Sequence, residues 1–111
     1  MNSIMIETYY KVMGVIERNP HYTQRKIAKE LGYSLGKVNY VIASLAGKGL
    51  VKLQRFWESD NKRGYMYVLT KKGIRDKYRI TREFLNRKMR EYDTIAKEIE
   101  EARNILNDTH V

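Results

Sequence analysis

The sequence has no cysteine, only one proline and two histidines. Without cysteine, disulfides, thiolate metal sites and thiol redox sensing are excluded. No segment approaches the roughly 18 consecutive apolar residues that span a membrane. The first residues carry Glu7 without a preceding basic region, so they are not typical of a signal peptide. We therefore expect a cytoplasmic protein with no membrane partner.

The residue patterns of enzymes are also missing. His21 follows Pro20 in an expected turn, and His110 lies next to the end of the chain. There is no HExxH spacing, no glycine-rich phosphate loop and no nucleophile elbow. We expect no enzyme activity, and therefore no catalytic residues, no metal and no cofactor.

Positive charge is what the sequence has in excess. It carries 22 Lys and Arg against 13 Asp and Glu, a net charge of +9 over 111 residues. Such an excess favours polyanionic partners, nucleic acid first and an anionic membrane surface second. The length allows one compact domain and one appended element.

Three short helices are predicted in the first half of the chain. Apolar residues at helical spacing predict the first over residues 4–18, which Pro20 ends. Thr23 is the expected N-cap of the second helix, Gln24–Leu31, and Gly32 fits the left-handed position that ends it. Ser34 is the expected N-cap of the third.

The third helix is predicted at about Leu35–Lys48 and is stopped by Gly49. Alternating residues then predict a strand over 50–57 and a second strand at Tyr65–Leu69, joined by a polar turn. The third helix and the first strand are each expected to turn one apolar face toward the core. In the third helix this face holds Leu35, Val38, Ile42 and Leu45, and in the first strand it holds Val51 and Leu53.

From Thr70 to about Leu106 the sequence predicts one helix of about 36 residues, or about 54 Å. Its apolar residues recur every seven positions, as in a coiled coil, with defects at Thr81 and Lys88. Phe84 and Met89 flank this seam and are expected to broaden it in the first half of the helix. We expect this seam to form a homodimer, although a helix folded back on its own domain is the alternative. The expected interface residues are Ile74, Tyr78, Leu85, Lys88, Tyr92, Ile95, Ile99, Ala102 and Leu106.

Charge is distributed unevenly along this helix. Residues 71–90 hold nine basic residues against two acidic ones, whereas residues 91–111 hold six acidic residues against Lys97 and Arg103. An antiparallel pair would lay basic halves against acidic halves, whereas a parallel pair would let Glu98 meet Arg103 of the partner. The charges favour the antiparallel pair, although a basic half that lies near DNA is a second explanation of the same charges. A dimer that reads one face of DNA needs recognition helices about 34 Å apart. A fully overlapped antiparallel pair is long enough to hold them farther apart than this, so the sequence leaves both orientations open.

The order helix, helix, helix and hairpin is that of a helix-turn-helix with a wing. We predict a mainly α fold with a small β-hairpin (α+β). Residues 1–70 are expected to form a winged helix-turn-helix DNA-binding domain, and residues 71–111 a long C-terminal dimerisation helix. Residues 34–48 would be the recognition helix in the major groove, and the wing at 55–65 would lie on the backbone or in the minor groove.

The outer face of the recognition helix has no acidic residue, as a groove lined with phosphates requires. The sequence allows two orientations of the Asn39 side chain, which would either pair with adenine or face the second helix. The start of the second helix would hold a phosphate. The candidate DNA-binding residues are Thr23, Gln24, Arg25, Ser34, Gly36, Lys37, Asn39, Tyr40 and Ser44, with Arg55, Lys62 and Arg63 in the wing.

Two segments carry a family resemblance, TQRKIAKELGYSLGKVNYVIASLAGKGLV and YMYVLTKKGI. With the long C-terminal run, they resemble the MarR-type winged-helix regulators, and more closely a short subgroup associated with exopolysaccharide gene clusters. The resemblance covers about residues 7–106. It implies a homodimeric, sequence-specific regulator of transcription that binds double-stranded DNA. Larger members often bind a small phenolic effector, and whether this chain has an effector stays open.

Two other functions compete with DNA recognition. A winged-helix adaptor would use the coiled coil to bind a different protein, but it leaves the positive charge unused. RNA binding fits the charge, but the sequence shows no exposed aromatic platform on a sheet.

Overall fold

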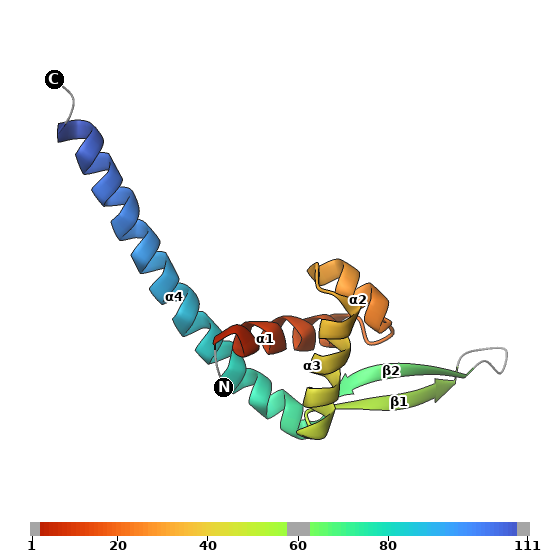
Figure 1. Cartoon of the computed structure of the whole chain (residues 1–111). Helices are drawn as coiled ribbons and strands as arrows, with labels where there is room; N and C mark the ends of the chain where they lie inside the picture. The colour runs from red at the N-terminus through yellow and green to blue at the C-terminus, as the bar shows by residue number, and fades with distance from the viewer. Residues whose placement is uncertain (1–2, 58–62, 109–111) are drawn as a thin grey trace.

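The structure is a computed structural model that describes residues 3–57 and 63–108, with side chains at residues 4–55 and 64–108. Three helices are followed by a hairpin and one long helix (Figure 1). The predicted fold class, a winged helix-turn-helix followed by a long C-terminal helix, is confirmed. The elements are α1 (Ser3–Arg18), α2 (Gln24–Leu31), α3 (Leu35–Gly47), β1 (Val51–Trp57), β2 (Arg63–Leu69) and α4 (Lys71–Asp108).

The predicted caps set the bounds of α2 and α3. The Thr23 hydroxyl accepts a hydrogen bond from the Lys26 N–H at 3.2 Å, and the Ser34 hydroxyl accepts one from the Lys37 N–H at 3.1 Å. Gly32 has φ of 70°, a left-handed conformation that glycine adopts without a steric penalty. These local signals account for the accurate prediction of both helix starts.

The hydrophobic core lies around α1, which α2, α3, the hairpin base and α4 surround (Figure 1). It is formed by Ile6, Tyr9, Val12, Met13, Val15, Ile16, Ile27, Ala28, Val38, Val41, Ile42, Leu45, Leu50, Val51 and Ile80.

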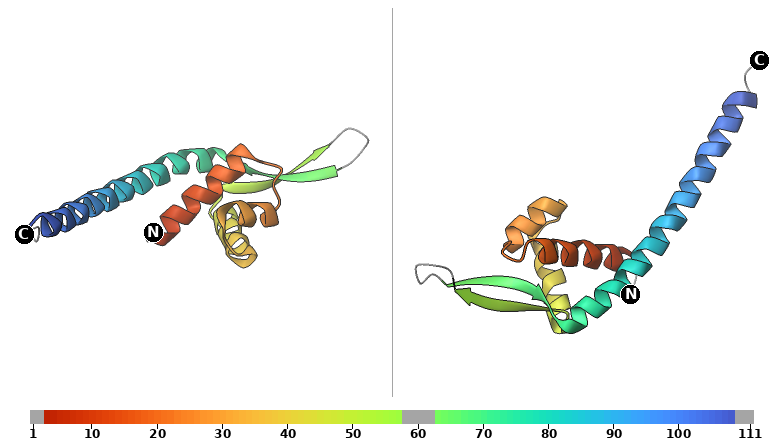
Figure 2. Two further views of the ribbon diagram at one scale, coloured as in Figure 1. Left: turned by 90° about the horizontal axis from the view of Figure 1, so that it is seen from above. Right: turned by 180° about the vertical axis from the view of Figure 1, so that it is seen from behind.

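Two predicted inner-face residues lie outside this core. Leu35, the first residue of α3, is 41% exposed. Leu53 is 57% exposed, whereas Val51, two residues earlier in β1, is buried. The hairpin as a whole extends away from the helices (Figure 2). The prediction was therefore wrong at both positions, although β1 and β2 pair antiparallel, with Leu53 opposite Tyr67.

The first half of α4 packs against α1, and its second half extends alone beyond the domain (Figures 1 and 2). Ile80 is buried in the core, and the Phe84 ring stacks on the Tyr10 ring with 4.2 Å between centroids. Lys77 forms an ion pair with Glu17. Phe84 therefore packs within its own chain and does not broaden the seam, so the fold-back alternative is correct for this face of α4.

Lys88 lies where α4 leaves α1. Its ammonium is 3.5 Å from the Glu7 carboxylate and 3.2 Å from that of Glu91. The hydrogen bond from Lys11 and the charge of Lys88 lower the pKa of Glu7. Lys88, expected in the dimer interface, thus contacts carboxylates of its own chain.

The junction between the hairpin and α4 is tightly packed. The Thr70 N–H donates to the Leu50 carbonyl at 3.0 Å, and the Thr70 hydroxyl donates to the Gly49 carbonyl at 2.6 Å. The Gly73 N–H donates to the Thr70 hydroxyl at 2.9 Å. A β-carbon on Gly73 would lie 2.0 Å from the Leu50 carbonyl oxygen, so only glycine fits there.

Candidate nucleic-acid interface

The outer face of α3 is exposed and contains no acidic residue. Tyr40 projects from it with 65% exposure. Gly36 leaves open space, since an added β-carbon would meet no atom within 4 Å. Of the candidate DNA contacts on this helix and its cap, those exposed are Ser34, Gly36, Lys37, Asn39 and Tyr40.

Lys37 is held in place by an aromatic ring. Its ammonium lies 3.9 Å from the centroid of the half-buried Tyr33, a cation–π distance. The ring places the charge at the N-terminal end of α3, where a recognition helix meets base edges. Sequence reasoning missed Tyr33, although its position four residues before Lys37 was a signal.

A chain of side-chain hydrogen bonds joins α3, α2 and β2. The Asn39 amide donates to the Gln24 carbonyl oxygen at 3.2 Å, and the Gln24 amide donates to the Tyr67 hydroxyl at 3.1 Å. The Tyr67 N–H also donates to the Pro20 carbonyl at 3.1 Å. Asn39 therefore faces the second helix, which was the second of its two predicted orientations. The hydrogen bonds from Asn39 through Gln24 to Tyr67 fix the wing relative to α3. Tyr67 was missed, because only the tertiary fold brings it to Gln24.

Ser44 does not belong to the exposed face. It is half-buried, and its hydroxyl is 2.5 Å from the Tyr9 hydroxyl of α1. The Ser44 hydroxyl is thus engaged with α1, and its role as a DNA contact stays a prediction.

The start of α2 lies beside α3. Thr23 uses its hydroxyl as the N-cap, and Gln24 is engaged with Asn39 and Tyr67. Arg25 is exposed. Of these three predicted contacts, Arg25 offers a charged group at the surface.

The wing brings a cation and an aromatic ring together. Arg55 and Tyr65 are opposite each other in the β1–β2 register, and the guanidinium carbon lies 5.8 Å from the ring centroid. Both side chains are exposed. Lys62 lies outside the described residues, as does the side chain of Arg63, the first residue of β2.

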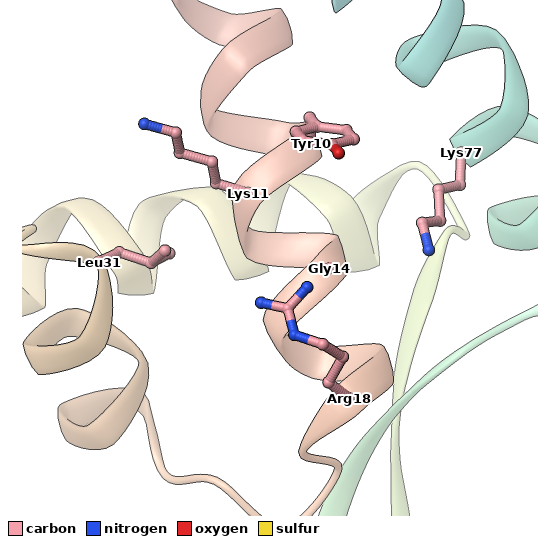
Figure 3. A pocket seen from close by; sticks show the side chains of 6 residues that line it. All are labelled: Tyr10, Lys11, Gly14, Arg18, Leu31 and Lys77. Atoms are coloured by element: carbon pink, nitrogen blue, oxygen red, sulfur yellow. The ribbon is translucent and has the colours of Figure 1, made fainter.

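A small cavity of about 140 Å³ lies between α1, the end of α2 and α4. In Figure 3 the Arg18 guanidinium lies beside Gly14, and Lys77 extends toward it from α4. Each of the three cations that line it lies within ion-pair distance of a glutamate. The pairs are Lys11–Glu7, Arg18–Glu30 and Lys77–Glu17, and the other lining residues are Tyr10, Gly14 and Leu31.

Residues 7–52 match the family described as winged helix-turn-helix DNA-binding. This segment spans α2, α3 and the start of β1, together with most of α1. The chain has the winged-helix fold of MarR- and PadR-type transcriptional regulators. A search of curated proteins finds no significant match.

Solved regulators of these types resemble the winged-helix chain over most of its length. The PcaV regulator of Streptomyces coelicolor, solved with its natural ligand, is 21% identical, with a TM-score of 0.59, over 90% of this chain and 73% of PcaV. A PadR-like regulator of Bacillus cereus is 12% identical, with a TM-score of 0.68, over 84% and 97%. FabT of Streptococcus pneumoniae, solved in complex with DNA, is 25% identical, with a TM-score of 0.50, over 91% and 75%.

Within the described ranges 3–57 and 63–108, no group of three or more His, Asp or Glu side chains is placed to hold a metal ion. None of the helices in this part of the chain is long and apolar enough to cross a bilayer.

Proposed function

We propose that this chain is a homodimeric transcriptional regulator of the cytoplasm that recognises specific sequences in double-stranded DNA. The observation that carries the proposal is the exposed, acid-free face of α3 in a winged-helix domain of a chain with net charge +9. Residues 1–70 would bind DNA, and residues 71–111 would dimerise. The resemblance to regulators of exopolysaccharide clusters stays a prediction.

In this proposal α3 enters the major groove. Lys37 donates to guanine acceptors or to a phosphate, and Tyr40 contacts a phosphate or a thymine methyl. Arg25 contacts the backbone at the start of α2, and Arg55 does so from the wing, with Lys62 and Arg63 at its tip. FabT, a protein of similar fold, was solved in complex with DNA, which supports DNA binding by a chain of this fold.

Asn39 and Gln24 have a different role in the proposal. Each gives an amide group to the hydrogen-bond chain that ends at Tyr67. We infer that they orient the wing relative to α3 and position the contacts around them.

The affinity for DNA is expected to fall steeply with salt. If about eight phosphates are contacted, log affinity against log salt has a slope near −7. Fluorescence anisotropy with a random-sequence duplex at low and physiological salt measures this slope. Absence of binding at low salt would contradict the proposed function.

Replacing Lys37 by alanine is expected to weaken DNA binding about tenfold or more. The melting temperature should fall by no more than a few degrees, because the side chain is exposed and loses only its cation–π contact with Tyr33. The matched control is Lys97→Ala, which removes the same charge from the distant, exposed end of α4. Anisotropy and thermal unfolding together measure both effects, and equal affinities of the two variants would remove Lys37 from the interface.

The second candidate is an adaptor that binds a different protein through α4. The uncovered apolar side chains in the second half of α4 favour it. Size-exclusion chromatography with light scattering separates the two candidates, because a stable homodimer would already occupy that face.

A further inference from the structure

α4 carries two apolar faces, and only one of them is covered. Ile80 and Phe84 pack on the core. A second row of apolar residues, on a different face of the helix, remains exposed. This row runs the length of the helix. In a single chain its members are 48–72% exposed. The row consists of Ile74, Tyr78, Leu85, Tyr92, Ile95, Ile99 and Leu106.

The two halves of α4 have opposite charge. Residues 71–90 hold nine Lys and Arg against Asp76 and Glu83, whereas residues 91–108 hold six Asp and Glu against two cations. In a parallel pair each half would face a half of its own sign. In an antiparallel pair each half faces one of opposite sign, so the charge pattern favours antiparallel pairing with a second copy.

We propose that α4 pairs antiparallel with α4 of a second copy, overlapped along its whole length. This proposal rests on the homodimer of the proposed function and specifies its geometry. Full overlap of Lys71–Asp108 makes the two helices cross close to Met89, which is 57% exposed. The lone second half of each helix then covers the exposed row beside the partner's winged-helix domain.

The arrangement also sets the distance between the two α4 starts. α4 has 38 residues, so the two helix starts lie about 57 Å apart at 1.5 Å per residue.

Disulfide mapping in the full chain tests the orientation, and the natural sequence has no cysteine to interfere. We expect Met89→Cys to crosslink to itself and Leu106→Cys not to. A mixture of Leu106→Cys with Ile74→Cys is expected to form a crosslinked heterodimer. Asn104→Cys is the control, because Asn104 lies on the helix near Leu106 but outside the exposed row.

Light scattering on each variant separates the possible failures. A dimer in which Leu106→Cys crosslinks to itself is parallel, which overturns the orientation but not the homodimer. A dimer without any crosslink through these positions overturns the pairing of α4. A monomeric parent chain contradicts both this proposal and the homodimer. It does not contradict DNA binding by the winged helix, which the anisotropy titration tests separately.

Discussion

Replacing Gly73 by alanine is expected to lower the free energy of unfolding by about 3 kcal/mol or more. The new β-carbon would lie 2.0 Å from the Leu50 carbonyl oxygen and 3.0 Å from its carbonyl carbon. Both atoms are backbone, and the same oxygen accepts the Thr70 N–H, so α4 has to move away from the hairpin. At about 4–8 °C per kcal/mol, the melting temperature should fall by more than 10 °C.

The control for this prediction is Gly47→Ala in α3, where an added β-carbon meets no atom within 4 Å. Alanine has the higher helix propensity, so the melting temperature should stay equal or rise slightly. Thermal unfolding by circular dichroism measures both variants. If Gly73→Ala melts with the parent chain, the close approach of α4 to Leu50 is wrong.

Replacing Leu85 by aspartate is expected to weaken the homodimer about a hundredfold or more. The residue is 55% exposed in the single chain and lies within the exposed row of α4. In the dimer the change buries one unpaired carboxylate from each chain, which costs several kcal/mol. Light scattering at a concentration where the parent chain is dimeric should give the mass of one chain.

The matched control is Asn86→Asp, which adds the same charge one residue further along α4, outside the exposed row. It should remain dimeric, and both variants should keep the helical circular dichroism spectrum, because neither side chain is in the core. A Leu85→Asp chain that still dimerises would place the interface elsewhere than on α4.

α3 shows what could and what could not be predicted from the sequence. Its start was predicted correctly, because the N-cap Ser34 and its acceptor bond are local. Its outward residues followed from helical periodicity as far as Tyr40. The periodicity did not place Ser44 or Leu35, because their burial depends on where α1 begins and ends beside α3.

The hairpin shows the same limit in a strand. Alternation predicted Val51 and Leu53 on a buried side, but only Val51 is buried, because the core does not cover β1 as far as Leu53. The role of Tyr67 was also hidden. It depends on a contact with Gln24, 43 residues away in the sequence.

By itself the sequence determined the order of helices and strands, their caps and the seven-residue period of α4, because these depend on neighbours within a few residues. The tertiary structure alone decided which apolar residues of α4 are covered by α1 and which remain exposed. It also decided that Gly73 is a contact point and that Asn39 and Gln24 bond each other. These features depend on segments that are distant in the sequence and meet only when the core forms around α1.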